Sequence, residues 1–312
     1  MNPGHKGRDQ SLDVNGIHFA LRTWGNEDGY PVLALHGWLD NAASFERIAP
    51  LLRDCFVVAP DLAGHGRSDH RRADSGYYLW EHADDMNALV ECLGWKRFAV
   101  LAHSMGTGVA SILAAMNRNI DRMVFLDGMG APFTLAQGNT VEHLRKSQRL
   151  LRLALRTRMH GFSGPEYAQF SSLEAAVNER RNGIGGSLSE EGARLLALRD
   201  LINLGHGYRW RHDPRLVLPE LLPLTEQQAC EFLQQITCPL YLLLGLQGLF
   251  AGPGFDKRKA ALPLDARVRW YEGGHHFHLD TPAPGLIEQL NAALGASQGR
   301  ENVHSLSNGV HR

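Results

Sequence analysis

Ser104 occupies the kind of position from which a serine hydroxyl can attack a carbonyl group. It lies in the stretch Ala102-His103-Ser104-Met105-Gly106, between the apolar run 98–102 and a helix-like stretch at 105–116. Small residues two positions to either side let a strand and a helix approach closely around a strained, exposed serine. The first of these positions holds alanine, where glycine is usual. A serine that caps an ordinary strand–helix turn is the alternative interpretation.

A histidine-rich segment near the end of the chain could supply the base that such a serine needs. Gly273-Gly274 precedes His275, His276 and His278. A serine hydroxyl is a poor nucleophile until a neighbouring base accepts its proton, and two glycines permit a loop that carries a histidine over a sheet edge. A metal site through His275 and His278 is the rival interpretation. No acidic or cysteine partner at ligand spacing supports it, so we expect no metal.

Stabilisation of a tetrahedral oxyanion requires two N–H donors, and the sequence offers both from the main chain. The residue after the nucleophile, Met105, provides the first donor. The motif His36-Gly37-Trp38 follows the apolar run 31–35, and the N–H of Trp38 would provide the second. A simple turn is the alternative interpretation of this motif.

Short apolar runs alternate with helical patterns, which predicts an α/β fold with a mostly parallel sheet flanked by helices. The runs cover 31–35, 55–59, 98–102, 123–126, 239–244 and 266–271, and a hairpin is expected at 12–24 around Asn15-Gly16. Helical spacing marks 77–93, 105–116 and 284–294. Functional groups in such sheets gather at the carboxyl ends of the strands. The residues at these ends are His36, Asp61, Ser104 and Asp127.

The strand pattern is interrupted between residues 132 and 235, where helix-like stretches follow at 141–159, 165–181 and 189–203. We therefore expect a core formed by 1–131 and 236–296, a helical cap or lid at 132–235, and a flexible tail at 297–312. Leucines of the cap would form an apolar pocket wall. One cap helix carries a basic run, which we interpret as a solvated face, with a membrane surface or an anionic substrate as the alternative partner. The run consists of Arg145, Lys146, Arg149, Arg152, Arg156 and Arg158.

Composition excludes some classes of function. The 312 residues include 32 Lys and Arg against 33 Asp and Glu, a formal net charge of −1. A nucleic-acid-binding protein usually shows a basic surplus, so we expect no nucleic-acid partner. The first residues are polar, the apolar runs are too short for a transmembrane segment, and the four cysteines form no C-x-x-C pair. These features predict a cytoplasmic protein.

Together these motifs resemble those of the serine hydrolases of the α/β-hydrolase fold, over about residues 13–294. The stretch HGWLDNAASF at 36–45 is most similar to the serine hydrolase-like proteins, and DLAGHGRS at 61–68 is a further family motif. The resemblance implies a catalytic histidine that follows glycine and shortly precedes an acidic-x-Pro sequence. Gly274-His275 and Asp280-Thr281-Pro282 fit this frame. His275 is therefore the expected base, and His276 is the second choice.

The acid of the triad departs from the pattern that the resemblance implies. Most family members carry it after the strand that follows the cap, where this chain has Gly248. Some members supply it from the end of the strand after the nucleophile helix, and Asp127 stands there. The order Ser104, Asp127, His275 agrees with the order of the fold. A neutral histidine base needs an orienting partner, so we favour Asp127 as the triad acid over a capping or loop role.

These residues predict a serine hydrolase that cleaves a small or medium hydrophobic carboxylic ester, or a related acyl bond, through an acyl-enzyme. No cofactor is expected, and the partner is a small hydrophobic acyl substrate. A serine nucleophile disfavours the dehalogenases and epoxide hydrolases of the fold, which use a carboxylate. The alternatives are a C–C bond hydrolase or perhydrolase with the same triad, and a non-catalytic ligand-binding member of the fold. The oligomeric state is left open.

Overall fold

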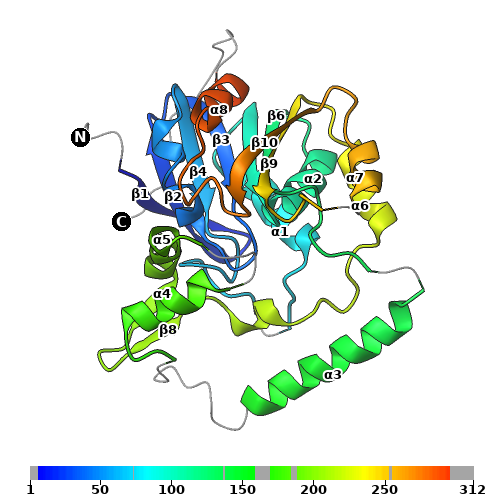
Figure 1. The fold of residues 1–312 in the computed structure, drawn as a ribbon. Helices are drawn as coiled ribbons and strands as arrows, with labels where there is room; N and C mark the ends of the chain where they lie inside the picture. The colour runs from blue at the N-terminus through cyan, green and yellow to red at the C-terminus, as the bar shows by residue number, and fades with distance from the viewer. Residues whose placement is uncertain are drawn as a thin grey trace.

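The computed structural model describes residues 6–72, 74–135, 138–158, 169–183, 188–252 and 255–295. An eight-stranded sheet in the order β1-β2-β4-β3-β5-β6-β9-β10 forms its centre (Figure 1). The strands are β1 (Arg8–Val14), β2 (Ile17–Gly25), β3 (Tyr30–Leu35), β4 (Cys55–Pro60), β5 (Phe98–His103), β6 (Ile120–Leu126), β9 (Leu240–Gln247) and β10 (Arg267–Gly274). All neighbouring pairs from β4 to β10 in this order are parallel. The strand β2 pairs antiparallel with both of its neighbours, β1 and β4. The predicted α/β fold with its mostly parallel sheet is confirmed.

The first hairpin forms where the sequence predicts it. Asn15 and Gly16 between β1 and β2 have φ angles of +52° and +76°. Two consecutive left-handed residues make a turn whose twist matches that of the flanking strands, and asparagine followed by glycine adopts this conformation at the lowest steric cost. The turn therefore sets the register in which Val14 pairs with Ile17.

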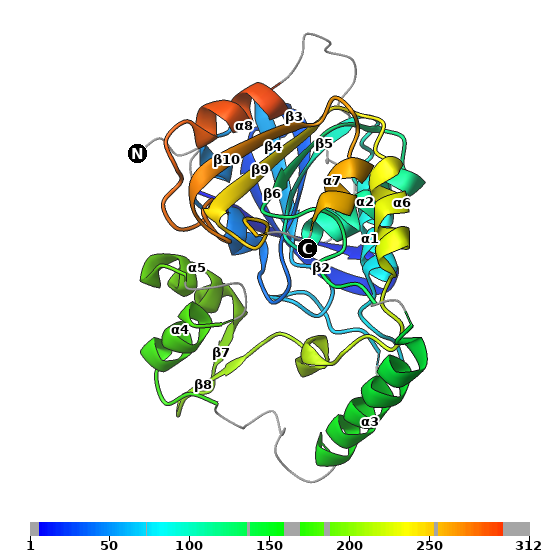
Figure 2. The ribbon, with the colours of Figure 1, turned by 45° about the vertical axis from the view of Figure 1, so that its right-hand side comes forward.

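Helices cover both faces of the sheet, because each central strand buries side chains on both sides. In β3, Leu33 packs with the helices α1 (Leu79–Cys92) and α2 (Gly106–Met116), while Val32 packs toward α8 (Leu286–Leu294). This alternation follows from the two-residue period of a strand. Two further helices, α6 (Glu226–Gln234) and α7 (Asp256–Ala261), lie on the same side as α2 (Figure 2).

Before it returns to the sheet as α6, the segment between β6 and β9 extends beyond one end of the sheet (Figure 2). It contains α3 (Thr140–Arg158), α4 (Leu173–Arg181), α5 (Glu190–Asp200) and the short turn η4 (Pro214–Val217). A two-stranded antiparallel pair, β7 (Leu201–Asn203) and β8 (Tyr208–Trp210), follows α5. We call α4, α5, β7 and β8 together the α4–α5 unit.

The helix expected at 189–203 thus ends at residue 200, and its last three residues form β7. Gly205, with a φ angle of +84°, permits the tight reversal into β8. The polar stretch at 41–53 forms two short 3₁₀ turns, η2 (Ala42–Phe45) and η3 (Ala49–Leu51), because Pro50 fits only the first turn of a helix. The helix expected at 165–181 forms as α4 over residues 173–181, while residues 165–168 and the tail after residue 295 lie outside the described residues.

An apolar cluster joins the α4–α5 unit to the sheet. Val177 of α4 and Leu196 of α5 pack with Ala43 of η2 and with Leu279, which follows β10. Burial of such side chains contributes roughly 25 cal/mol per Å² of apolar surface removed from water. The unit is therefore held against the loops at the carboxyl ends of the strands.

The helix α3 carries the basic run noted in the sequence. Arg145, Lys146, Arg149 and Arg152 lie on its described part, and the side chains at 156 and 158 lie outside the described residues. Among the described helices, including α3, none is long and apolar enough to cross a bilayer.

Close packing of α2 against the end of β3 depends on Gly106. A β-carbon at this position would lie 2.8 Å from the carbonyl carbon of Leu35 and 2.9 Å from the carbonyl oxygen of His36. The substitution Gly106→Ala is therefore expected to destabilise the protein by about 1–3 kcal/mol, although alanine favours helix more than glycine does. Urea unfolding measures the change. Gly252→Ala, which places its β-carbon in open space, is the matched control; equal stability of the two variants would contradict this account.

Candidate active site

Ser104 sits on a sharp turn between β5 and α2. Its φ angle is +51°, in the left-handed region that non-glycine residues rarely adopt. The turn is held by hydrogen bonds from the Ser104 N–H to the Leu126 carbonyl (3.1 Å) and from Thr107 Oγ1 to the Ser104 carbonyl (2.7 Å). The strand–turn–helix context predicted for the serine is therefore present.

His275 bridges Ser104 and Asp127. Its Nε2 lies 2.9 Å from Ser104 Oγ, and its Nδ1 lies 2.6 Å from Asp127 Oδ2. A carboxylate can only accept, so Nδ1–H donates to Asp127 and leaves Nε2 free to accept the serine proton. The three side chains that the sequence singled out from distant parts of the chain thus form one continuous chain of hydrogen bonds.

Asp127 follows β6 and is fully buried. Its Oδ1 accepts a hydrogen bond from the Gly245 N–H (3.0 Å), and its Oδ2 accepts one from the Leu249 N–H (2.9 Å). Both donors belong to β9 and the loop after it. The backbone of the neighbouring strand therefore fixes the orientation of the carboxylate and compensates for its burial.

The position of the Asp127 carboxylate explains why residue 248 is a glycine. A β-carbon at position 248 would lie 2.5 Å from Oδ2 and 2.6 Å from Cγ of Asp127. The carboxylate of Asp127 consequently fills the space that a side chain at 248 would need. The carboxylate of Asp127, which follows β6, therefore lies where a side chain from the loop after β9 would otherwise lie.

Burial keeps His275 in its neutral form. The pKa of His275 is lowered to about 4, chiefly because burial removes the water that would stabilise the charged imidazolium. The hydrogen bond to Asp127 raises the pKa and opposes this effect, while the neighbouring His103 and His276 lower it further. At neutral pH the imidazole is therefore unprotonated and able to accept a proton.

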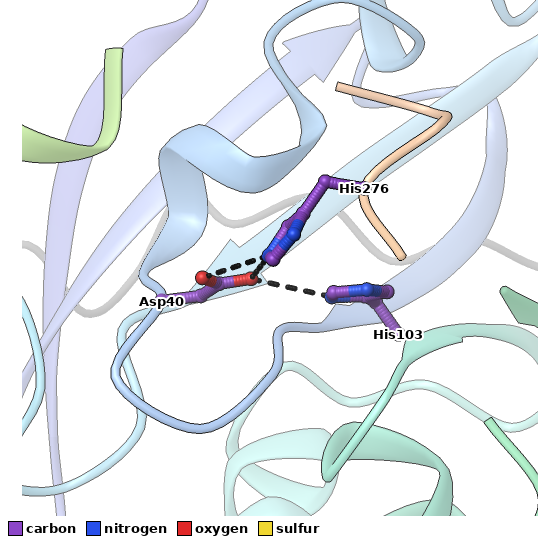
Figure 3. A group of neighbouring side chains, drawn as sticks. All are labelled: Asp40, His103 and His276. Carbon is purple, nitrogen blue, oxygen red and sulfur yellow. Dashed lines mark hydrogen bonds and ion pairs between the residues drawn. The ribbon is translucent and has the colours of Figure 1, made fainter. Parts of the chain in front are cut away.

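The remaining histidines of the segment have other partners. His276 Nε2 lies 3.2 Å from Asp40 Oδ2 (Figure 3), and His278 Nε2 lies 3.2 Å from Ser44 Oγ. Neither ring reaches Ser104 in the hydrogen bonds of the described residues. Of the two candidates for the base, His275 and not His276 therefore lies within hydrogen-bond distance of Ser104, and His275 and His278, the pair considered for a metal, have different partners.

The sequence analysis did not predict a buried cluster of Asp40, His103 and His276. The ligand atoms of Asp40, His103 and His276 all lie within 4.8 Å of one another (Figure 3). Asp40 lies in the loop after β3, His103 ends β5 and His276 follows β10, so their proximity depends on strand order. No local pattern in the sequence signals it.

The loop after β3 passes directly beside the nucleophile. A β-carbon on Gly37 would lie 3.1 Å from Ser104 Cβ, so the backbone of this loop packs against the serine. Trp38 is anchored by a hydrogen bond from its Nε1 to the Leu216 carbonyl (2.9 Å). His36 is fully buried, and its Nε2 accepts from the Leu62 N–H (2.9 Å), which assigns it to loop packing rather than to chemistry.

Asp61 supports the backbone and does not point at Ser104. Its carboxylate accepts from the N–H groups of Ala42 (2.7 Å) and Arg67 (2.8 Å), and it pairs with Arg199 of α5 (2.8 Å). His65 is also buried, and burial holds its pKa well below the usual range. Both residues therefore have structural contacts in the loops around the site.

Comparisons with known proteins identify the family to which the chain belongs. The family model described as the alpha/beta hydrolase fold matches residues 30–282. A serine hydrolase-like protein of Dictyostelium discoideum is 30% identical over 296 residues, covering 88% of this chain and 78% of the relative. The human serine hydrolase-like protein 2 is 31% identical over 286 residues, covering 87% and 89%.

Two solved structures extend the comparison. A hypothetical protein from Pseudomonas aeruginosa PAO1 has a TM-score of 0.79 and 39% identity, covering 92% of this chain and 97% of that chain. A thioesterase domain from the curacin biosynthetic pathway has a TM-score of 0.74 and 25% identity, covering 92% and 98%. The chain therefore belongs to the α/β-hydrolase family, among relatives named serine hydrolase-like proteins.

Proposed function

We propose that this protein is a serine hydrolase that cleaves hydrophobic carboxylic esters or related acyl bonds. The observation that carries the proposal is the chain of hydrogen bonds from Ser104 Oγ through His275 to Asp127. A hydroxyl, an imidazole and a carboxylate in this order form the unit that performs acyl transfer in serine hydrolases.

The reaction follows from the roles of the three groups. Ser104 Oγ attacks the carbonyl carbon and gives its proton to His275 Nε2. The imidazolium then protonates the leaving alcohol as the C–O bond breaks, which leaves an acyl-enzyme. Water attacks the acyl-enzyme and loses a proton to His275, which passes it to Ser104 Oγ as the bond to the acyl group breaks and the acid is released. Asp127 holds the ring and offsets its positive charge in both steps.

The main-chain N–H groups of Trp38 and Met105 are proposed as the oxyanion hole. The packing of Gly37 against Ser104 and the position of Met105 at the start of α2 support this assignment. The first turn of a helix carries unsatisfied N–H groups and the positive end of its dipole, so negative charge is stabilised there. Each such donor contributes about 10²–10³ in rate in enzymes of this type.

Apolar side chains near the nucleophile support a hydrophobic acyl group. Phe133 is 64% exposed and meets the Trp38 ring edge to face at 6.0 Å. Leu249, whose N–H holds Asp127, is 52% exposed. The curacin domain to which this chain is similar is a thioesterase domain, and this likeness also favours an acyl substrate. We further propose that 132–235 serves as a cap over a core of 1–131 and 236–296.

The first test is covalent labelling by a fluorophosphonate, combined with hydrolysis of acyl esters of graded chain length. The wild-type protein is expected to react, and Ser104→Ala is expected to lose both activities, with turnover falling by about 10⁶-fold. Ser111→Ala changes a buried serine on α2 whose hydroxyl donates to the Gly108 carbonyl, and it should keep both. A folded wild-type protein that is not labelled would favour the non-catalytic ligand-binding alternative.

The second test concerns the acid. Asp127→Asn is expected to lower turnover by about 10⁴-fold in a protein that still folds, because an amide does not select the productive tautomer of His275. Gly248→Ala should also reduce turnover, since its β-carbon displaces the carboxylate. Asp121→Asn, at the opposite end of β6, is the matched control. Near-normal ester turnover by Asp127→Asn would refute the role of Asp127.

The third test is the pH dependence of fluorophosphonate labelling. Protonated His275 cannot accept the serine proton, and burial lowers its pKa to about 4. The rate is therefore expected to fall about tenfold per pH unit below about pH 4 and to be level between about pH 5.5 and 7.5. Circular dichroism at each pH confirms that the fold persists. A midpoint above about pH 6, close to the pKa of a free histidine, would contradict the assigned protonation state.

A further inference from the structure

Asp40 is a carboxylate with partners on both of its oxygens. It is buried, with a side chain that is 0% exposed. Its Oδ2 accepts from Ser44 Oγ (3.2 Å) and lies 3.2 Å from His103 Nδ1 and 3.2 Å from His276 Nε2. Its Oδ1 forms an ion pair with the guanidinium of Arg180. This carboxylate takes no part in the acyl-transfer steps proposed above.

The partners of Asp40 come from four separate parts of the fold. His103 ends β5 immediately before the nucleophile, and His276 follows the base His275 in the chain. Arg180 lies in the last turn of α4, in the unit that lies outside the sheet. Asp40 is therefore the point at which the α4–α5 unit is connected electrostatically to the two segments that carry Ser104 and His275.

The connection reaches the catalytic histidine along two routes. His103 Nε2 lies 3.0 Å from the main-chain carbonyl oxygen of His275, and its other ring nitrogen faces Asp40. His276 is covalently linked to His275 and also faces Asp40. The backbone of His275 is thus held from both sides by groups that Asp40 orients.

The charge on Asp40 depends on these neighbours. Burial by itself would raise the pKa of Asp40, but His276, His103 and Arg180 outweigh this effect and hold the pKa well below its usual range. Arg180 is the one permanently charged group among the partners described above. A buried carboxylate that loses its cation is left uncompensated, and the groups around it must rearrange or change protonation.

The same residues could also be considered as ligands of a metal ion, since their ligand atoms are close together. The guanidinium of Arg180 already occupies Oδ1, and Ser44 and the two histidines face Oδ2. A guanidinium at this position would repel a divalent cation. The arrangement is therefore that of a positioning network.

We propose that Asp40 and Arg180 position His275, so that docking of the α4–α5 unit against the sheet completes the catalytic site. Asp40 and Arg180 are positioning residues, because they act on His275 through His103 and His276 and do not touch the reacting atoms. The expected effect on the labelling rate rests on the proposed function. The expected effect on the backbone around His275 rests only on the contacts of Asp40.

The kinetic test is a double-mutant cycle on Asp40→Asn and Arg180→Gln, read as the rate of fluorophosphonate labelling. Each single variant is expected to label at least tenfold more slowly than wild type. The double variant should be no slower than Asp40→Asn alone, since both changes break one interaction. Arg180→Lys, which keeps the charge, should recover part of the rate. Labelling of Arg180→Gln within twofold of wild type, or effects that multiply in the double variant, would overturn the proposal.

Arg199→Gln is the matched comparison. Arg199 makes the corresponding ion pair from α5 to the buried Asp61, which makes no contact with His103 or His276 among the hydrogen bonds of the described residues. This variant also weakens the contact between the α4–α5 unit and the core, and is expected to slow labelling less than threefold. If Arg199→Gln slows labelling as much as Arg180→Gln does, the effect is general loosening and the proposal fails.

Amide hydrogen exchange separates the proposal from the proposed function. The N–H groups of Phe277 and Leu279 bond to the Gly274 and His276 carbonyls (3.1 and 2.8 Å). Arg180→Gln is expected to speed their exchange at least tenfold, and Arg199→Gln is not. If wild-type protein is not labelled at all, the proposed function fails, and exchange alone decides: unchanged exchange in Arg180→Gln overturns the positioning role.

Discussion

The hydrogen bond between His275 and the buried carboxylate of Asp127 is the interaction on which the site depends. It fixes the tautomer of the ring and aims Nε2 at Ser104 Oγ. The carboxylate is itself held by two main-chain N–H groups of β9 and its following loop. The sheet therefore sets the position of the carboxylate. A rigid sheet can hold three side chains from distant parts of the chain in a fixed arrangement.

Strand polarity explains why these groups meet at one edge. In a parallel sheet the carboxyl ends of all strands lie together, and β3, β5, β6, β9 and β10 each contribute a loop there. The left-handed conformations of Ser104 and Asp127 turn the chain sharply at two of these ends. The strain is supported by the buried strands on both sides.

The same edge concentrates buried titratable groups. Burial favours the neutral form of His276 and His278 by lowering the pKa of each, whereas the buried carboxylates Asp40 and Asp61 are matched by arginines from α4 and α5. An apolar cluster accompanies these ion pairs. Two arginines and an apolar surface thus connect the α4–α5 unit to loops on either side of the nucleophile.

Sequence patterns alone predict the sheet, most of its helices, and the candidates for nucleophile and base. These are local properties: apolar runs bounded by glycine and proline, and a serine between a strand and a helix, have the same meaning in any chain. The sequence also ranked Asp127 as the acid, although Gly248 at the expected position left a binding protein as an alternative.

The partners of the buried polar groups depend on contacts that exist only in the folded protein. The family resemblance ranks His275 first among the three histidines after Gly274, but the direction of each ring depends on which neighbour it meets across the sheet. The clash between a side chain at 248 and the Asp127 carboxylate is likewise a contact between strands. Asp40 and Arg180 are 140 residues apart, and no sequence period relates them. Hydrogen bonds and ion pairs act over a few ångströms in space, so partners distant in the chain are fixed only when the strands are ordered.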